Sequence, residues 1–232
     1  MFHIVESWDW SGAGRASRRQ PGLARASWSS TSRSYGLTHG FSRNDVIKFM
    51  QQHATAVEKG TLALVSFDFP FSFPYLAKGN QFIDGGTNWN VFGSTVHAAL
   101  QPDGAARRVY GSPADYGQGG FPDHFSHLFM GAGNIGPNYL EVYRATENFA
   151  RQQGLPAASV FRLVLPMVGV QSLGGIYVLQ ALLKWCIKQR FPLTIWPLGR
   201  LDRSGVWHEG TVDWNDHGLV IVESYPRISF HR

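Results

Sequence analysis

Three carboxylates each stand at the carboxyl end of an apolar segment with strand-forming residues: Asp9, Asp68 and Glu223. In an open α/β sheet, sites form in the crevice beside the carboxyl ends of the strands. An acid after a buried strand is costly to bury alone, so it is paired, hydrogen-bonded or bound to a metal. We therefore expect the three acids to gather at one site.

Such a trio of acids favours metal-dependent chemistry on phosphate esters. Converging carboxylates repel one another, and hard divalent cations, which prefer oxygen ligands and keep bound waters, relieve that repulsion. Two such ions can hold the attacking water and the leaving oxygen of a phosphodiester. The trio thus predicts Mg²⁺ or Mn²⁺ as the cofactor, with Asp9, Asp68 and Glu223 as catalytic residues and metal ligands.

Each acid also has an ordinary structural interpretation, because acids at strand ends are common. Asp9 can cap the turn at 11–14, and Asp68 can orient the Phe-Pro loop that follows it. Glu223 can pair with Arg227. The recurrence of the pattern on three strands is what favours a shared site.

A basic stretch follows the first of these segments. Residues 12–35 hold five arginines and no acid, and the formal net charge of the chain is +5. One interpretation is a loop that contacts the phosphates of a polyanion such as a nucleic acid. The other is a solvated surface loop rich in Ser and Gly. The five arginines are Arg15, Arg18, Arg19, Arg25 and Arg33.

Substrate contacts are expected in two places. The first is the start of the basic stretch, and the second precedes a predicted helix, whose free amides can hold an anion. Helix capping explains the second place equally well. The candidate residues are Ser11, Arg15, Arg18 and Arg19 in the first place, and Gln171 and Ser172 in the second.

The hydrophobic pattern predicts an α/β protein whose buried strands are flanked by helices. Ser42 is a candidate N-cap, and Gly60 closes the helix that it begins. The segment 160–165 fits a strand or a packed loop. Strands are predicted at 3–10, 61–67, 193–196 and 219–223, with weaker ones between 23 and 35, and helices at about 88–100, 123–130, 138–153 and 174–189.

Composition indicates one globular domain, 1–232, with a long helical insertion at about 75–190. Of the 232 residues, 44% are hydrophobic and 16% charged, which excludes a disordered chain. One cysteine excludes an intrachain disulfide, and neither a signal peptide nor an apolar stretch of about 18 residues is recognisable. We expect a cytoplasmic protein without a membrane segment. The sequence does not predict its oligomeric state.

Several motifs, in their order, resemble a bacterial family of predicted ribonuclease H-like nucleases related to Holliday-junction resolvases, domain-of-unknown-function family 429. The resemblance spans nearly the whole chain. It implies an α/β fold with a ribonuclease H-like mixed sheet flanked by helices, whose first strand carries Asp9, with Asp68 and Glu223 as further metal ligands. The motifs are Trp8-Asp-Trp-Ser-Gly-Ala13, Phe67-Asp-Phe-Pro-Phe71, Gly169-Val-Gln-Ser-Leu-Gly-Gly175, Trp196-Pro197 and Val222-Glu-Ser-Tyr-Pro226.

The sequence departs from that family at its end. Related chains usually continue into a final helix with one or two more Asp residues, which completes the metal site in ribonuclease H-like nucleases. This sequence stops at Arg232, six residues after Pro226. We expect either that the chain is a truncated version of the family's domain or that another acid takes the place of the acids in the final helix. The candidate substitutes are Asp45, Asp84, Asp213 and Asp216.

Three weaker motifs are set aside. Gly131–Gly136 has the spacing of a dinucleotide-binding loop but follows a predicted helix rather than a strand. Gly169–Gly174 lacks the glycine two positions before the serine that a nucleophile elbow needs. His124 and His127, next to Asp123, lack the further ligands of a zinc site.

Three functions follow as hypotheses. The first is a metal-dependent nuclease or phosphodiesterase. The second is a non-catalytic nucleic-acid-binding module, which the missing last helix favours. The third is a small-molecule phosphotransfer enzyme, because the same broad fold underlies actin-like and sugar-kinase folds, although no second nucleotide-binding half is recognisable.

Overall fold

The structure is a computed structural model that describes residues 2–10, 17, 19, 23–57, 59–72, 89–100, 143–155, 157, 168–210 and 218–224. The chain divides into two compact units. The first holds Met1–Ser11, Ala16–Asp68 and Val178–Ser224, and the second holds Gly12–Arg15, Phe69–Tyr177 and Tyr225–Arg232. The expected single domain with an insertion at 75–190 stays a prediction.

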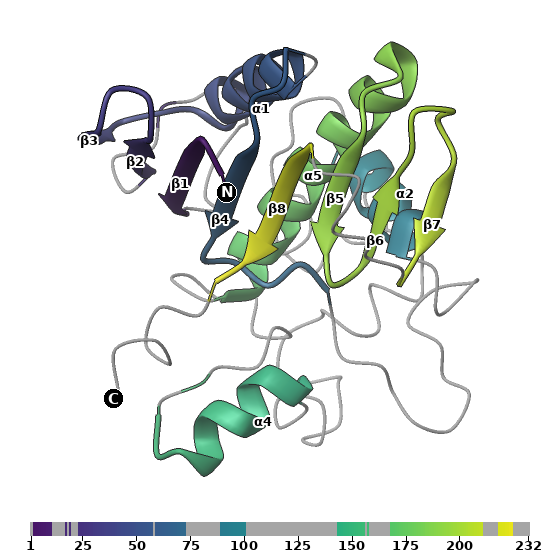
Figure 1. The fold of residues 1–232 in the computed structure, drawn as a ribbon. Coiled ribbons are helices and arrows are strands. Elements are labelled where there is room, and N and C mark those ends of the chain that lie inside the picture. Colours follow the sequence, from purple (N-terminus) through teal and green to yellow (C-terminus); the bar gives the residue numbers. More distant parts are fainter. Residues whose placement is uncertain are drawn as a thin grey trace. The chain divides into compact units, whose positions relative to one another are not determined.

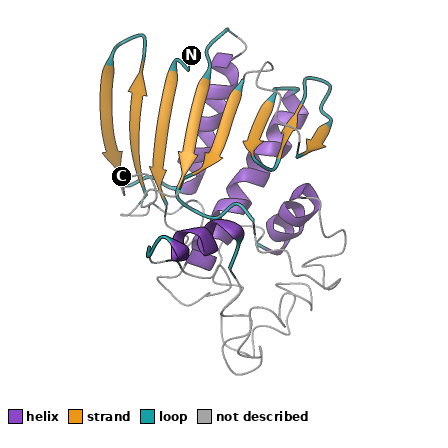
Figure 2. Cartoon of the chain, turned by 60° about the horizontal axis from the view of Figure 1, so that its bottom comes forward, coloured by secondary structure: helices purple, strands orange, loops and turns teal. Residues whose placement is uncertain are grey.

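The first unit contains an eight-stranded mixed sheet in the order β3-β2-β1-β4-β8-β5-β6-β7 (Figures 1 and 2). Together with four helices in the described part of the chain, the sheet confirms a mixed α/β fold. The strands are β1 (Ile4–Asp9), β2 (Ala24–Ser29), β3 (Ser34–His39), β4 (Ala63–Phe67), β5 (Leu193–Trp196), β6 (Gly199–Leu201), β7 (Trp207–Glu209) and β8 (Leu219–Glu223).

The chain enters the sheet as an antiparallel meander of β1, β2 and β3. Helix α1 (Arg43–Val57) then leads to β4, which lies parallel to β1 on its other side. β8 and β5 continue the parallel part, and β6 and β7 complete the sheet as an antiparallel pair. β1, β4 and β8 run in the same direction, so their carboxyl ends lie side by side at one end of the sheet, as the sequence predicted.

One face of β1 and β4 packs against α1. Trp8 is fully buried, and its ring contacts Phe41, Phe49 on α1, and Phe67 on β4. Successive side chains of a strand point to opposite faces, so the residues beside Trp8 and Phe67 belong to the other face. Asp9 and Asp68, which follow Trp8 and Phe67, therefore project from the face of the sheet opposite to α1.

Ser42 caps α1, as predicted. Its hydroxyl oxygen accepts the backbone N–H of Asp45 at 3.1 Å. In return, the Asp45 carboxylate accepts hydrogen bonds from the Ser42 backbone N–H at 2.9 Å and from the Ser42 hydroxyl at 2.7 Å. This reciprocal capping box satisfies N–H groups that the first turn of a helix leaves without partners. Asp45, a candidate substitute acid, is thus occupied in capping.

Ser42→Ala is expected to lower the free energy of unfolding by about 1 kcal/mol, because the first turn of α1 loses its cap. Urea denaturation followed by circular dichroism measures the change. Thr55→Ala in the same helix is the matched control, since its hydroxyl donates to the Gln51 carbonyl, which is already a helix acceptor. Equal losses in both variants would contradict a specific cap.

In the second unit, the described helices are α2 (Trp89–Ala99), α4 (Ala145–Gln152) and the first part of α5 (Val168–Gln189). The Trp89 indole donates to the Phe71 carbonyl at 2.8 Å. The ring of Phe69 lies so close to Gly175 that a Cβ there would be 2.2 Å from it. The Phe69 ring therefore fits at this position only because Gly175 has no Cβ.

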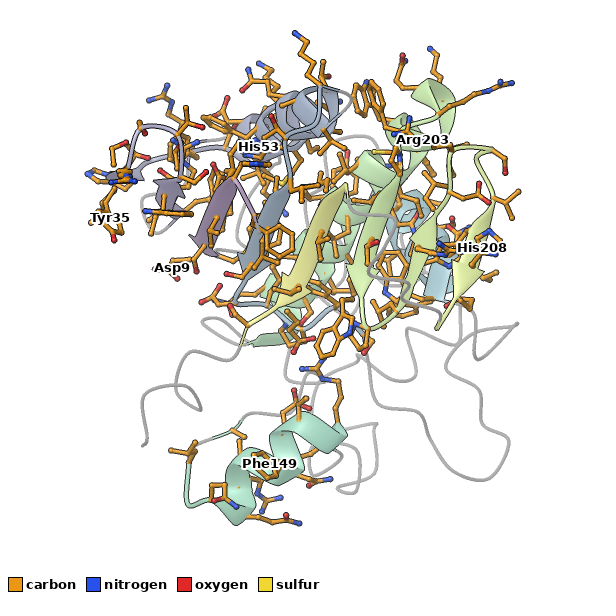
Figure 3. All side chains as sticks on the ribbon, in the orientation of Figure 1. Asp9, Tyr35, His53, Phe149, Arg203 and His208 are labelled. Atoms are coloured by element: carbon orange, nitrogen blue, oxygen red, sulfur yellow. The ribbon has the colours of Figure 1, made fainter. Side chains whose placement is uncertain are left out.

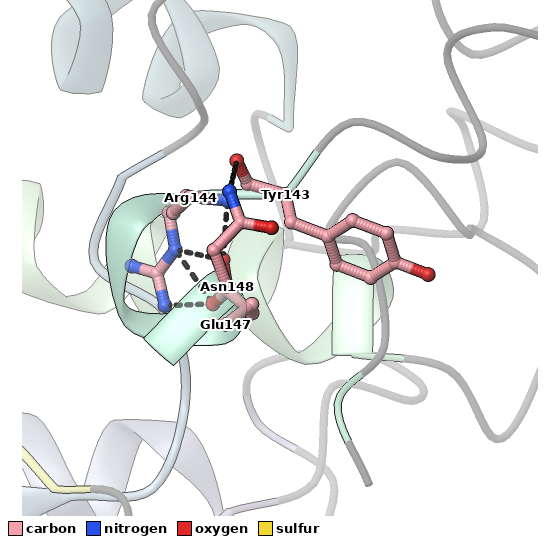
Figure 4. A network of polar contacts seen from close by, with 4 residues as sticks. All are labelled: Tyr143, Arg144, Glu147 and Asn148. Carbon is pink, nitrogen blue, oxygen red and sulfur yellow. Dashed lines mark hydrogen bonds and ion pairs between the residues drawn. The ribbon is translucent and has the colours of Figure 1, made fainter. Parts of the chain in front are cut away.

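Two helices begin elsewhere than predicted. α4 begins at Ala145, not near Asn138, because Glu147 accepts the Arg144 backbone N–H at 2.7 Å and pairs with the Arg144 guanidinium (Figure 4). α5 begins at Val168 rather than at Gly174. The predictions at 123–130 and 160–165 lie outside the described residues.

The hairpin of β6 and β7 was not predicted, so two strands between β5 and β8 were missed. Asp202 organises its turn by accepting the backbone N–H groups of Ser204 and Val206 at 2.9 and 3.0 Å. His208 Nε2 lies 2.7 Å from the other Asp202 oxygen. Among the described helices, none is both long and apolar enough to span a bilayer.

Candidate carboxylate site

Asp9 and Asp68 lie at the same level of two neighbouring parallel strands. In the register of β1 and β4, Trp8 pairs with Phe67, so the next residue of each strand is an aspartate. The Asp68 backbone N–H donates to the Trp8 carbonyl at 3.3 Å, which extends the ladder to this level. Asp9 is exposed at the end of β1 (Figure 3), and Asp68 is half-buried. The structure thus brings these two predicted residues together.

The Asp9 and Asp68 side chains lie on the same face of neighbouring strands, and one oxygen of Asp68 is held by the backbone. Asp68 Oδ1 accepts the Trp10 backbone N–H at 2.8 Å. The pKa of Asp68 is raised from 3.8 to about 7, chiefly by burial and also by the charge of Asp9 and a hydrogen bond between the two side chains, while the Trp10 amide lowers it. None of these causes is a positive charge from a described residue.

Asp68→Asn is expected to stabilise the protein at pH 8 by roughly 2 kcal/mol, because the neutral carboxamide keeps the Trp10 hydrogen bond and avoids both the burial of a charge and the repulsion from Asp9. A raised folded-state pKa favours the folded state below pH 3.8, and this contribution is lost as the pH rises to about 7. The gain should therefore vanish near pH 4. Urea unfolding of both proteins across this pH range measures it.

Asp45→Asn is the control of opposite sign. The hydrogen bond from the Ser42 hydroxyl lowers the pKa of Asp45, and the charges of Lys48 and Arg19 lower it further. Its stabilisation is therefore present above pH 3.8 and is lost as the pH falls. Asp45→Asn should be destabilising at pH 8. A gain in stability from both substitutions would contradict the repulsion between Asp9 and Asp68.

Glu223 stands one residue short of this level. β8 lies parallel to β4 with Glu223 paired to Phe67, so its side chain projects from the face of Phe67. By the same alternation, Asp9, Asp68 and Ser224 belong to the opposite face. Within the described ranges, no three His, Cys, Asp or Glu side chains form a group suited to a metal ion. The expected trio is thus reduced to a pair there.

Ser224 is the neighbour of Asp68 that the sequence analysis missed. Its backbone N–H donates to the Phe67 carbonyl at 2.8 Å, which places Ser224 level with Asp68. Its hydroxyl oxygen is buried and has no hydrogen-bond partner. The signal was present in the Glu-Ser-Tyr-Pro motif, but only the strand register distinguishes the serine from the glutamate.

The expected polyanion contacts are described only in part. Ser11, Arg15 and Arg18 lie outside the described residues, and Arg19 is exposed. Gln171 and Ser172 belong to the second unit, where Gln171 is half-buried and Ser172 has no exposed surface. Both are inside α5 rather than before it, because the helix begins at Val168. The other named candidates, Asp84, Asp123, His124, His127, Gly131–Gly136, Asp213, Asp216 and Arg227, also lie outside the described residues.

Arg25 does not face outward as a phosphate contact. Its guanidinium Nη1 lies 3.3 Å from Glu6 Oε1, and its Cζ lies 4.3 Å from the centre of the Phe49 ring. Glu6 is only 3% exposed and also accepts the Trp8 indole N–H at 3.1 Å. The reason is electrostatic, because a buried carboxylate requires a partner. The interpretation of Arg25 as part of a polyanion loop is corrected accordingly.

The pair of Asp9 and Asp68 has the donor chemistry of a divalent-cation site. Mg²⁺ is commonly bound by one or two carboxylates and keeps several waters. A cation would also neutralise the charge that raises the pKa of Asp68. The residues present therefore fit one Mg²⁺ or Mn²⁺ held by two carboxylates.

Comparison with known proteins gives no match: no family model, no curated protein and no solved structure matches the chain. The resemblance to domain-of-unknown-function family 429 therefore stays a prediction.

Proposed function

We propose that this chain is a metal-dependent phosphodiesterase or nuclease of the ribonuclease H-like type. The observation that carries the proposal is that Asp9 and Asp68 lie side by side on one face, at the carboxyl ends of two parallel strands. A site of this kind takes a hard divalent cation, and Mg²⁺ or Mn²⁺ is the cofactor that we assign to it. When bound, such an ion stabilises developing charge on a phosphoryl oxygen and lowers the pKa of a bound water.

The residues have separate roles in this proposal. Asp9, which is exposed, and Asp68 would hold the cation. The Trp10 amide fixes one oxygen of Asp68, so that its carboxylate keeps one orientation. Pre-orientation of this kind lowers the free-energy cost of assembling a catalytic site. A substrate phosphate would approach from the face that Asp9 and Asp68 share.

Two further features support a ribonuclease H-like fold within the α/β class. The sheet is mixed, and its first strand ends in Asp9, as the family resemblance implies. The antiparallel meander of β1 to β3 is joined through α1 to a strand parallel to β1, so the second aspartate arrives beside the first. Glu223 is not assigned a ligand role, because the register places it on the other face.

Calorimetric titration of Mn²⁺ into the protein tests the cation site. We expect binding to the unaltered chain at pH 7.5 and its loss in Asp68→Asn, because one of two carboxylate ligands is removed. Asp45→Asn is the matched control, since it removes a carboxylate that caps α1 and should leave binding unchanged. Absence of binding to the unaltered chain, or equal binding by Asp68→Asn, would refute the site.

A further inference from the structure

In the part of the chain that the structure describes, the edge strand β3 shows none of the usual protection. Among the described strands, β3 has a single hydrogen-bonded neighbour, β2, with which it forms six consecutive pairs without a bulge. All six residues of β3 are exposed, and its sequence, SYGLTH, has no proline, lysine, arginine or acid. Edge strands in natural proteins are usually short, charged, bulged or interrupted by proline, because an open edge pairs with other strands.

The opposite edge of the sheet differs. β7 has three residues, all partly buried, and it ends in Glu209. The Trp207 indole donates to Glu209 at 2.8 Å, so the side chains of β7 also contact one another. A short strand with a charge at its end is a poor template for pairing. The lack of protection is therefore specific to β3.

The exposed apolar side chains of β3 share one face. Tyr35 is 85% exposed and Leu37 79%, the largest values among the exposed hydrophobic residues described. They alternate with Ser34, Gly36 and Thr38, so both belong to the same face of the strand. Tyr35 also pairs with Trp28 of β2, which extends the apolar surface inward. Tyr35 lies at the outer margin of the sheet in Figure 3.

From this edge we infer that two copies of the chain associate antiparallel through β3, about a two-fold axis at Gly36. This register sets Tyr35 of each copy opposite Leu37 of the other, and Ser34 opposite Thr38. Directly opposed apolar pairs and hydroxyl pairs both stabilise antiparallel strands. A two-fold interface requires such a self-complementary surface, and β3 provides it without a charge at any of these positions.

A second copy fits this edge better than a nucleic acid does. Binding of a polyanion is driven by Lys and Arg contacts to phosphates, and β3 has neither residue. The edge supplies backbone hydrogen bonds and two neutral apolar side chains, which another strand of the same composition matches. The two sheets then become one continuous sheet.

The dimer is independent of the proposed phosphodiesterase function. β1, which carries Asp9, is the second strand from β3, about 10 Å away at the usual strand spacing. Substitutions on the exposed face of β3 therefore leave the carboxylate pair intact. Loss of Mn²⁺ binding and loss of the dimer can be observed separately.

Sedimentation velocity from about 1 to 100 µM tests the inference by mass action. We expect a species of about twice the 25.8 kDa chain mass at the high end. Leu37→Lys should raise its dissociation constant at least about tenfold, because it replaces an apolar contact with Tyr35 by a charge. Val206→Lys, at a 51% exposed residue of the β6–β7 turn, is the control and should leave the dimer unchanged.

A mixing experiment tests the register. In the proposed pairing, the two Leu37 side chains are diagonal neighbours, within reach of long side chains. Equimolar Leu37→Lys and Leu37→Glu should therefore form a heterodimer more tightly than either variant alone forms a dimer. Far-ultraviolet circular dichroism confirms that both variants fold. An unaltered chain that stays monomeric throughout, or a dimer that Leu37→Lys leaves intact, would overturn the inference.

Discussion

Asp9→Asn and Asp68→Asn are each expected to lower cation-dependent phosphodiester cleavage by about a thousandfold or more, because two carboxylates that hold one ion act as a unit. For the same reason the double variant should be no worse than either single variant. Removing one ligand already removes the ion, so the second substitution has little left to affect. This non-additivity distinguishes a shared site from two independent contributions.

The assay uses bis(p-nitrophenyl) phosphate together with single-stranded and double-stranded oligonucleotides, with Mn²⁺ or Mg²⁺ and with chelator. Asp45→Asn serves again as the matched carboxylate-to-amide control and should cleave like the unaltered chain. Cleavage that survives in the double variant would refute a role for the pair. Mn²⁺ binding without cleavage of any substrate would instead favour the non-catalytic binding module.

The strand ends that carry Asp9 and Asp68 could be predicted because strands and helices leave different hydrophobic periods. The run before Asp68 is nearly continuous in apolar residues, which is typical of a strand inside a parallel sheet. Acids that follow such strands were then expected to lie close together, because the carboxyl ends of parallel strands lie at the same end of a sheet. The placement of Asp9 beside Asp68 required one further fact, the one-to-one register of β1 and β4.

Glu223 shows the limit of that reasoning. Its segment was predicted correctly as a strand, yet a shift of one residue in pairing moves every side chain to the other face. The register is decided by side-chain packing between strands, and the hydrophobic pattern within one strand does not reveal it. Ser224 rather than Glu223 therefore lies level with Asp68.

The missed elements have local physical causes. β6 and β7 have three residues each, too few for an alternating pattern, and the turn between them depends on the Asp202 side chain. Helix α5 was expected to begin at Gly174 and Gly175, and it begins six residues earlier, at Val168. Inside the helix, the Phe69 ring occupies the space that a Cβ at Gly175 would need.

The polar network around Glu6 was also missed, and it gives the largest expected effect on stability. Glu6 lies in β1 with its carboxylate under α1, where Arg25 Nη1 and His53 Nε2 lie 3.3 and 3.1 Å from Oε1. An acid inside an apolar strand was the only signal in the sequence. The buried carboxylate explains why the Arg25 guanidinium turns inward, toward Glu6.

Glu6→Ala is expected to lower the free energy of unfolding by about 3–5 kcal/mol, because it leaves the Arg25 guanidinium largely buried without its carboxylate. Urea denaturation followed by tryptophan fluorescence measures the loss, with Trp8 as a reporter inside the network. Ser7→Ala, at the exposed neighbouring position, should change stability by less than about 0.5 kcal/mol.

A double substitution separates the charge from the packing. Glu6→Leu with Arg25→Met replaces the ion pair by apolar side chains of similar size, and such replacements are often neutral or stabilising. The double variant should therefore recover most of the stability that Glu6→Ala loses. If Glu6→Ala instead costs less than about 1 kcal/mol, water reaches the network and the pair is a surface contact. Recovery would mean that the ion pair of Glu6 and Arg25 adds no net stability. Its role would then be to fix the orientation of α1 on the sheet.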